Sequence, residues 1–371
     1  MFEGLIVFGV LLIIGILISM FRINTLLNVV KGRDKKIATG SNKVNAALFV
    51  LFFLGGFGLF FWYSFAYYDD YTLPVASEHG VVTDRLFWIT TIPTGFIFVF
   101  TSALLFIFPY KYQYKEGAKA HFFPHNNKLE VIWTVVPAIV LSVLVFMGLR
   151  TWNDITSDAP DDAEVIEIMG YQFAWAVRYP GADPGDKLGS YDYQLIDASN
   201  NFGIDLTDEN AYDDFSPLEL HVPKGKTVLF KIRARDVLHS VFAPHFRLKM
   251  DAVPGMPTHF KFVPTKTTDE MRAELDDPEF NYEIACTEVC GRGHFSMRLL
   301  VVVDEPEDYE AWKKEQITWL KLNEDYLDKV PKELREKAII DSGIEIGEPD
   351  VADSDTEEVI KVDETEDIAS L

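Results

Sequence analysis

The chain has 371 residues, of which 48% are hydrophobic and 14% aromatic, enough for one large or two ordinary domains. Its net charge of −23 is unevenly distributed, because residues 1–150 carry a net charge of +4 and residues 151–371 carry −27. Phosphates and carboxylates repel each other, so the acidic second part excludes nucleic acid as a partner. The two cysteines, Cys286 and Cys290, are too few for a disulfide-rich scaffold or a four-cysteine iron–sulfur cluster, and no Cys-x-x-Cys-His haem motif occurs.

Four uncharged stretches are long enough to cross a membrane, which takes about 20 apolar residues. They are Gly4–Phe21, Val44–Tyr68, Leu86–Tyr110 and Val131–Leu149. The first could also be a signal peptide, although it lacks a positively charged start and a small-residue cleavage site. The loops at residues 22–43 and 111–130 are basic, whereas the loop between the second and third spans is acidic. The positive-inside rule therefore places both basic loops in the cytoplasm and everything after Arg150 on the opposite side.

Beyond residue 163 the sequence changes to short runs rich in β-branched and aromatic residues, separated by Gly and Pro. The expected strands are Glu164–Tyr179, Leu218–Val222, Thr227–Ala234, Thr258–Val263, Tyr282–Ala285 and Met297–Val303. This spacing predicts an all-β sandwich or barrel. The acidic segments Asp183–Pro217 and Asp269–Glu279 are predicted to be surface insertions, Glu305–Ile340 a helix, and residues 341–371 a disordered acidic tail.

Five side chains form a candidate metal site. Cys286, Cys290, His294 and Met297 lie within twelve residues, and His239 is expected near a strand end. Thiolate and thioether ligands favour copper over hard cations, but a mononuclear blue-copper site needs only one cysteine. With two cysteines, both sulfurs can bridge two copper ions, each with one histidine, and Met297 and a backbone carbonyl fill the axial positions. The alternatives are a disulfide in an oxidising compartment and a Cys₂His₂ zinc site, which would leave Met297 without a role.

Several segments in a fixed order carry a resemblance to a known family. Besides the metal loop, they are Asn127-Lys-Leu-Glu-Val-Ile-Trp-Thr-Val-Val-Pro137, Gly170-Tyr-Gln-Phe-Ala-Trp175, Asp236-Val-Leu-His-Ser240 and Leu248-Lys-Met-Asp-Ala-Val-Pro-Gly255. Together they resemble cytochrome c oxidase subunit II, with its binuclear copper centre CuA, over roughly Leu86–Tyr309. The resemblance implies an α+β membrane protein, in which a transmembrane hairpin precedes an extramembrane cupredoxin-like Greek-key β-barrel.

The same resemblance implies a division of the chain into four parts. Residues 1–80 hold two extra N-terminal helices, 81–155 the hairpin, 156–304 the copper domain, and 305–371 a C-terminal helix and acidic tail. The extra helices would contact another respiratory complex or separate the subunit from lipid, and no sequence feature decides between these two roles.

The resemblance also implies residue roles. The CuA ligands would be His239, Cys286, Cys290, His294, Met297 and the main-chain oxygen of Glu288. The Glu288 side chain would bind a Mg²⁺ shared with subunit I, and no haem would lie in this chain. Glu130, otherwise an ordinary interfacial charge, would mark the mouth of a proton pathway. The family often has tryptophan, its first electron acceptor, where this chain has Phe173; Trp175 and Tyr179 are therefore further candidates, and each of the three could instead be structural.

The function implied is that of subunit II of an aa3-like cytochrome c oxidase, active only within the complex. A c-type cytochrome, soluble or membrane-held, would supply electrons that pass to haem in subunit I, where O₂ is reduced to water and protons are pumped. Subunit III would be a further partner. The location implied is the bacterial cytoplasmic membrane, with the copper domain in the periplasm.

Four other classes share part of this pattern. A CuA-containing nitric oxide reductase has the same copper motif, and only its partner subunit distinguishes it; nitrous oxide reductase has a similar copper loop. A quinol oxidase subunit II has the hairpin and barrel but lacks the copper ligands. A membrane-tethered copper-delivery protein could use two cysteines and a histidine, but it would need neither the hairpin with Glu130 nor Met297.

Overall fold

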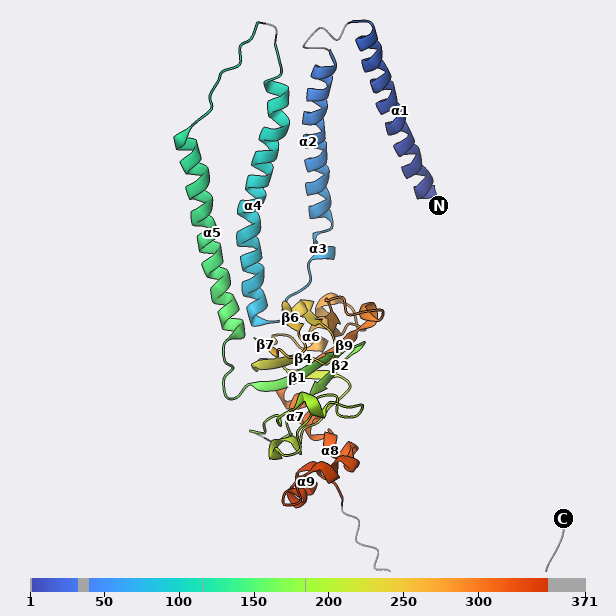
Figure 1. Cartoon of the computed structure of the whole chain (residues 1–371), viewed down its shortest axis with the longest axis vertical. Coiled ribbons are helices and arrows are strands. Elements are labelled where there is room, and N and C mark those ends of the chain that lie inside the picture. Colours follow the sequence, from blue (N-terminus) through green and yellow to red (C-terminus); the bar gives the residue numbers. More distant parts are fainter. Residues whose placement is uncertain (1, 33–39, 116, 184, 346–371) are drawn as a thin grey trace, which may run out of the picture.

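Four long helices extend from one side of a β-rich domain in the computed structural model (Figure 1). The structure describes residues 2–32, 40–115, 117–183 and 185–345; most of the tail predicted for residues 341–371 lies outside these ranges. The long helices are α1 (Phe2–Val30), α2 (Gly40–Ala66), α4 (Glu78–Lys111) and α5 (Asn127–Thr156), and one helical turn, α3 (Tyr68–Tyr71), follows α2. All four are long and apolar enough to cross a membrane, which confirms the four predicted spans.

The direction of the helices agrees with the charge pattern. The C-terminal ends of α1 and α4 lie far from the β-rich domain, as do the N-terminal ends of α2 and α5 (Figure 1). These four helix ends, which border the two basic loops, therefore lie on one side of the membrane and the β-rich domain on the other, as the positive-inside rule predicts.

Aromatic side chains join α2 to the hairpin. The ring centroid of Phe106 on α4 lies 5.7–5.8 Å from those of Phe49, Phe52 and Phe53 on α2, and Phe57 stacks on Phe98 at 5.4 Å. Apolar side chains of α1, from Phe8 to Val30, are largely exposed. A helix that is apolar on all sides, and that no other part of its chain covers, is typically surrounded by lipid.

Two facing sheets form the β-rich domain. Their strands are β1 (Glu164–Tyr171), β2 (Ala174–Arg178), β3 (Leu220–Pro223), β4 (Val228–Ala234), β5 (His239–Ala243), β6 (Leu248–Ala252), β7 (Thr258–Phe262), β8 (Tyr282–Cys286) and β9 (Arg298–Asp304). One sheet has the order β2-β1-β4-β7 and the other β3-β9-β8-β5-β6. The β1–β4 and β3–β9 pairs are parallel and the rest antiparallel. Ile166, Phe230 and Val301 lie in the common core, so the predicted all-β domain is confirmed.

The strands that carry the candidate metal site differ from the prediction. The single strand expected over Glu164–Tyr179 is a hairpin, because the chain turns at Gln172 and Phe173 and pairs β2 back along β1. His239, expected near a strand end, is the first residue of β5, whose pairing with β6 was not predicted. Both pairings are short hairpins between neighbouring segments, and neither turn was predicted from the sequence.

The long helix predicted over Glu305–Ile340 is wrong. The segment forms α7 (Pro306–Lys314), α8 (Trp319–Leu322), the 3₁₀ helix η6 (Glu324–Lys329) and α9 (Arg335–Ser342). Thr318 caps α8 by accepting a hydrogen bond from the Lys321 N–H, and its backbone bridges to Phe215. With this bridge in place, Trp319 and Leu320 are buried. A helix that continued from α7 could not form the bridge.

The acidic insertions are also more ordered than predicted. Asp269–Glu279 contains α6 (Thr268–Leu275), which begins with a capping box between Thr267 and Glu270. Within Asp183–Pro217, two 3₁₀ turns, η2 (Tyr193–Leu195) and η3 (Glu209–Ala211), flank apolar side chains that form a second core with the C-terminal helices. The members of this core include Met169, Phe202, Ile204, Leu206, Tyr212, Trp319, Leu320 and Tyr326. We call this insertion, together with residues 315–345, the accessory module.

A buried charge network attaches the accessory module to the sheet. Arg178 on β2 donates to Glu167 on β1 at 2.6 Å and to Asp214 of the insertion at 2.7 Å. Arg233 on β4 also donates to Glu167 and, at 2.9 Å, to the carbonyl oxygen of Phe202. These four charged side chains are all less than 10% exposed. Buried charges of this kind are stable only as a set, because each one lacks water to replace a missing partner.

Candidate metal centre

Three separate elements bring sulfur and imidazole groups together at one end of the five-stranded sheet. Cys286 is the last residue of β8, and it pairs with Val241 on β5, the strand that His239 opens. Cys290 and His294 lie in the loop before β9. This loop is closed by two backbone hydrogen bonds, from the Cys286 N–H to the Met297 carbonyl and from the Thr287 N–H to the Ser240 carbonyl.

The donor atoms form a continuous cluster. The two cysteine Sγ atoms lie 3.9 Å apart, and each has its own imidazole: His239 Nδ1 is 3.8 Å from Cys286 Sγ, and His294 Nδ1 is 3.6 Å from Cys290 Sγ. The Glu288 carbonyl oxygen lies 3.2 Å from Cys286 Sγ, and Met297 Sδ lies 3.9 Å from Cys290 Sγ.

This donor set fits a metal site. Separations of 3.2–3.9 Å are the distances expected between ligands that share an ion at bonds of about 2.0–2.3 Å. Both cysteines are free thiols, so the disulfide alternative does not describe this structure. His239, Cys286 and Cys290 form the one group of three or more His, Cys, Asp or Glu donors at metal-binding spacing within the described residues. Met297 Sδ lies within reach of the same sulfurs, and two thiolates, two imidazoles and a thioether are a soft set that suits copper.

A carboxylate fixes both the buried histidine and the β1–β2 turn. Asp236 Oδ1 lies 2.9 Å from His239 Nε2, which leaves His239 Nδ1 facing the sulfurs. The other oxygen of Asp236 accepts a hydrogen bond at 2.7 Å from the Gln172 N–H. Gln172 Nε2 in turn donates to the Cys290 carbonyl at 2.6 Å. The sequence indicated no role for Asp236 or Gln172. The available signal for Asp236 was its place three residues before the proposed ligand histidine. No such signal existed for Gln172.

The three aromatic candidates occupy different environments. Phe173 is 39% exposed and lies against the metal loop, where a Cβ added at Gly293 would come within 2.5 Å of its ring. Trp175 is 7% exposed and its ring meets that of His239 edge to face at 5.8 Å. Tyr179 has no exposed surface, stacks on Phe215 and donates to the His221 carbonyl. One of the three thus faces solvent at the metal loop, one faces the histidine from inside, and one belongs to the core.

The two predicted glutamates lie in separate parts of the fold, one on the metal loop and one on a membrane helix. Glu288 is exposed on the metal loop, so its side chain points away from the sulfurs that its carbonyl faces. Glu130 lies in the first turn of α5 and accepts a hydrogen bond at 3.3 Å from the Asn126 N–H, as part of that helix cap. Glu130 is exposed in the isolated chain.

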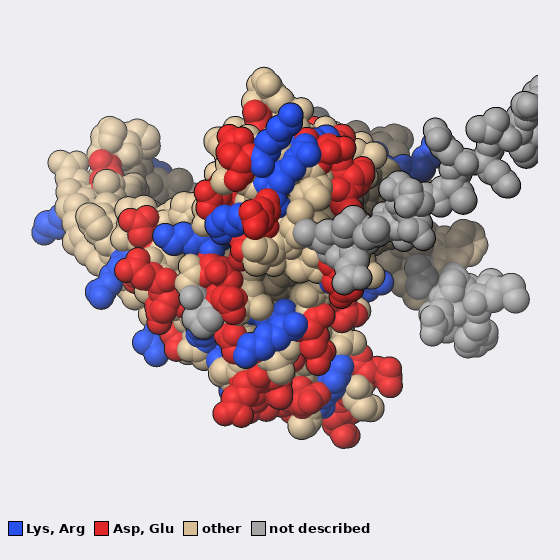
Figure 2. All heavy atoms as spheres, turned by 90° about the horizontal axis from the view of Figure 1, so that it is seen from below, with Lys and Arg blue, Asp and Glu red and all other residues tan. Residues whose placement is uncertain are grey.

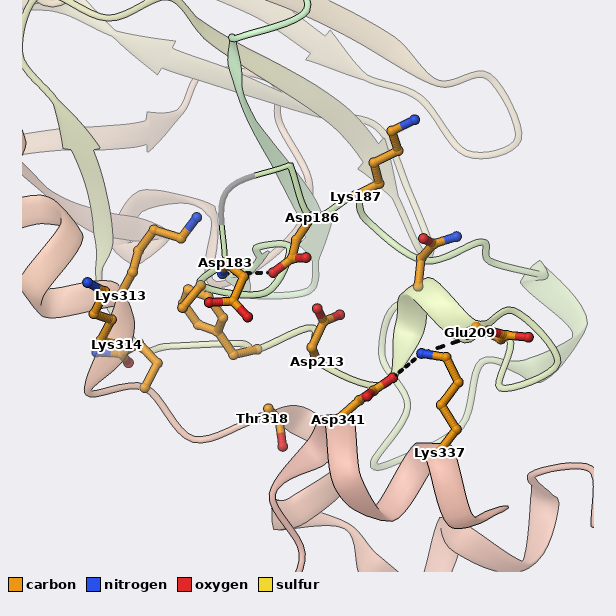
Figure 3. A pocket seen from close by; sticks show the side chains of 14 residues that line it. Asp183, Asp186, Lys187, Glu209, Asp213, Lys313, Lys314, Thr318, Lys337 and Asp341 are labelled. Carbon is orange, nitrogen blue, oxygen red and sulfur yellow. Dashed lines mark hydrogen bonds and ion pairs between the residues drawn. The ribbon is translucent and has the colours of Figure 1, made fainter. Parts of the chain in front are cut away.

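A second polar site lies in the accessory module and not at the sulfurs. A pocket of about 450 Å³ is lined by Asp183, Asp186 and Asp213, which face one another, with lysines around them (Figure 3). Its lining contains neither sulfur nor imidazole, so it does not suit copper. Burial, together with the neighbouring Asp186 carboxylate, raises the pKa of Asp213 to about 7.

Asp213 is expected to make the protein less stable as the pH rises. Its pKa is 3.8 when unperturbed and about 7 in the fold, so the folded state binds the proton more tightly and stability falls between about pH 4 and 7. The loss should be about 1–2 kcal/mol after allowance for partial solvent exposure. We expect Asp213→Asn to remove this part of the pH dependence, measured as thermal unfolding of the detergent-solubilised chain at pH 5 and pH 8. An equal pH response in both proteins would contradict the assignment.

The comparisons with known proteins agree with this architecture. The transmembrane domain of cytochrome C oxidase subunit II matches residues 63–151, and its periplasmic domain matches residues 164–304. The alternative cytochrome c oxidase subunit 2 of Bradyrhizobium diazoefficiens is 35% identical over 257 residues, which cover 67% of this chain and 85% of that protein. Cytochrome c oxidase subunit 2 of Thermostichus vulcanus is 28% identical over 297 residues, covering 65% and 76% of the two chains.

Among solved structures, the periplasmic domain of subunit II of cytochrome oxidase from Bradyrhizobium japonicum aligns with 22% identity and a TM-score of 0.29, covering 42% of this chain and 95% of that one. The assignment rests on the sequence matches, which span both the hairpin and the β-rich domain. The chain therefore belongs to the cytochrome c oxidase subunit II family, as a membrane-anchored subunit of a haem–copper oxidase whose copper domain is periplasmic.

Proposed function

We propose that this chain accepts electrons from a c-type cytochrome at a binuclear copper centre and delivers them to haem in subunit I of an aa3-like oxidase, which reduces O₂ and pumps protons. The observation that carries the proposal is the pair of buried thiols 3.9 Å apart, each with an imidazole of its own at 3.6–3.8 Å. A mononuclear copper carrier has use for only one of these two cysteines.

The residues that would hold the copper ions are the two thiolates as bridges, His239 and His294 as terminal ligands, and Met297 and the Glu288 carbonyl as weaker ones. When bound, such a centre shares one unpaired electron between two metals, so little geometry changes on electron transfer. The protein contributes rigidity: His239 is fully buried and Met297 is 1% exposed. Their neighbours therefore fix the ligand positions before any metal arrives.

Asp236→Ala should release His239 without removing a ligand. Loss of a hydrogen-bonded carboxylate behind a metal histidine typically costs about 10–100-fold in metal affinity. We expect a decrease of that size in the copper retained by the purified oxidase during dialysis against chelators of graded strength. Asp251→Ala is the matched control, because Asp251 bonds to Ser240 and Lys249 and contacts no proposed ligand. Equal copper retention in both variants would show that Asp236 does not orient the histidine.

Electrons would arrive at Phe173. This side chain combines exposure with contact to the metal loop, whereas Trp175 and Tyr179 are buried. Trp175, edge to face with His239, is better placed to pack that ring than to meet a docked donor. Phe295, an apolar side chain on the same loop that is 86% exposed, provides further contact surface for a partner.

The acidic surface would attract the donor. Acidic side chains cover much of the membrane-distal face, with lysines and arginines between them (Figure 2), and residues 151–371 carry a net charge of −27. Turnover with a basic c-type cytochrome should therefore fall as salt shortens the screening length from about 30 Å at 0.01 M to about 8 Å at 0.15 M. Oxygen consumption measured against ionic strength tests this. Turnover independent of salt would instead indicate a donor held permanently to the oxidase.

The remaining roles follow the family. We propose that the exposed Glu288 side chain binds a Mg²⁺ ion shared with subunit I, and that Glu130, on the cytoplasmic side, lies at the mouth of a proton pathway. Subunit III is a further expected partner, and the bacterial cytoplasmic membrane is the expected location. The number of copper ions per chain, and whether the unpaired electron couples to one copper nucleus or to two, decide the central part of this proposal.

A further inference from the structure

One arginine joins the β-rich domain to the membrane hairpin. Arg247 lies in the turn between β5 and β6, and its Nε and Nη2 donate to the two carboxylate oxygens of Asp84 on α4 at 2.7 and 2.9 Å. Nη2 also donates to the carbonyl of Leu73, in the segment before α4, and Nη1 to that of Pro244 in its own turn. A single guanidinium therefore holds the helix, the segment that leads into it and the strand hairpin.

The backbone of Arg247 adopts a conformation that side-chain-bearing residues rarely take. Its φ is 52°, in the left-handed region, which costs roughly 1 kcal/mol for a residue with a Cβ. The surrounding structure maintains this conformation through the four hydrogen bonds of its side chain. The Arg247 N–H also closes the turn by donating to the Pro244 carbonyl. In this conformation the side chain of Arg247 reaches α4.

Neighbouring contacts restrict the same junction. The Ala76 N–H donates to the His245 carbonyl at 2.8 Å, and Ser77 Oγ donates to the Phe246 carbonyl at 2.7 Å. Gly80 is in such close contact here that an added Cβ would lie 2.4 Å from Val75. On the other helix, His259 Nε2 lies 2.8 Å from the carbonyl oxygen of Thr156 at the end of α5. Both helices of the hairpin are thus tied to the domain.

The Arg247 junction leads directly to the candidate metal centre. β5 and β6 pair from Ala243 and Leu248, beside Arg247, to His239 and Ala252 at the other end. β5 also pairs with β8 where Val241 lies opposite Cys286. A short two-stranded ladder therefore connects the membrane helix to two of the proposed copper ligands, and a paired strand transmits displacement with little bending.

We propose that Arg247 and Asp84 are positioning residues that hold the metal centre at a fixed distance from the membrane hairpin, and through it from the haem-bearing subunit. The inference rests on the proposed function, because it concerns the transfer of electrons out of the same centre. Arg247 is 21% and Asp84 39% exposed at the side chain. Neither side chain belongs to the buried core of the β-rich domain, so removing the pair should leave that domain folded and change the geometry of the junction.

The test uses the assembled oxidase with Asp84→Ala, Arg247→Ala, the double variant, and the exchanged pair Asp84→Arg/Arg247→Asp. Asp328→Ala is the control, since it removes an exposed ion pair in the accessory module. Two rates are measured: reduction of the copper centre by donor, and electron transfer from copper to haem after a light pulse. Hydrogen exchange in residues 72–84 and 286–297 gives a readout independent of activity.

We expect each single variant to slow the copper-to-haem step severalfold, because the rate of electron tunnelling falls exponentially as the distance between the two centres grows. The double variant should be no slower than the single variants, and the exchanged pair should recover part of the wild-type rate of copper-to-haem transfer. Exchange should accelerate in residues 72–84 but not in 286–297, with copper content and reduction by donor unchanged.

Two results would overturn the inference. One is an unchanged copper-to-haem rate despite faster exchange at the junction. The other is loss of copper together with faster exchange in residues 286–297, which would make the pair a general structural support. If the wild-type oxidase lacks a two-copper signal, the proposed function itself fails, and this outcome is separate from both.

Discussion

Replacing Cys290 with serine is expected to abolish the binuclear copper centre and oxidase activity together. Cys290 Sγ lies within 4 Å of three other proposed donors: Cys286 Sγ, His294 Nδ1 and Met297 Sδ. A serine oxygen is a hard ligand that bridges two soft copper ions poorly. Loss of a residue behind a ligand costs about 10–100-fold, so loss of a bridging ligand should lower electron acceptance by more than about 100-fold.

The measurement is copper content and oxygen consumption of the purified oxidase. Val289→Ala is the matched control in the same loop, because Val289 is 81% exposed, lies between the two cysteines in the sequence and supplies no proposed ligand. It should retain copper and most activity. Full activity in Cys290→Ser would mean that the electrons take a route that avoids this cluster.

Replacing Arg178 with methionine is expected to give the largest loss of stability. The change leaves Asp214 with the Gly189 N–H as its remaining hydrogen-bond donor and leaves Glu167 with Arg233 alone. Removing one partner of a buried ion pair typically costs about 3–5 kcal/mol, because the other partner stays buried with fewer groups to stabilise it. A loss of this size in a domain of about 150–250 residues corresponds to a decrease in Tm on the order of 10 °C.

Thermal unfolding of the detergent-solubilised chain checks this expectation. The exposed pair Arg298–Glu283 gives the control, and Glu283→Gln should change the Tm by a degree or so at most. Equal effects of the two substitutions would contradict the view that burial makes the network essential. The Arg178 variant should also lose protection around Gly189, since Arg178 donates to that carbonyl.

The membrane helices and the metal cluster could be predicted because their signals are local. An uncharged run of about 20 residues has few alternatives to a membrane helix, and Cys286, Cys290, His294 and Met297 lie within one loop. His239 comes from a distant strand, and its place in the cluster depends on the pairing of β5 with β8. The sequence offered His239 only as a fifth candidate near a strand end, and the family resemblance implied its role as a ligand.

The parts that could not be predicted depend on long-range contacts. The local signal for Asp236 is only its place three residues before His239 in a chain rich in carboxylates, and Arg247 reveals its partner only when α4 is placed beside the β5–β6 turn. The helix expected over Glu305–Ile340 is interrupted because Trp319 and Tyr326 pack on Phe202 and other residues of the insertion. The same contacts order the insertion. Its acidic composition indicated only a surface loop, and nothing in the sequence indicated that it packs against the C-terminal segment.

The most direct test of the binuclear centre is an EPR spectrum of the purified oxidase, with copper quantified per chain. We expect two copper ions held by this chain and a hyperfine pattern in which one unpaired electron couples equally to both nuclei. We also expect this signal to disappear in Cys290→Ser and to persist in Val289→Ala. A spectrum in which the electron couples to a single copper nucleus, with one ion per chain, would contradict the binuclear centre and indicate a mononuclear copper site.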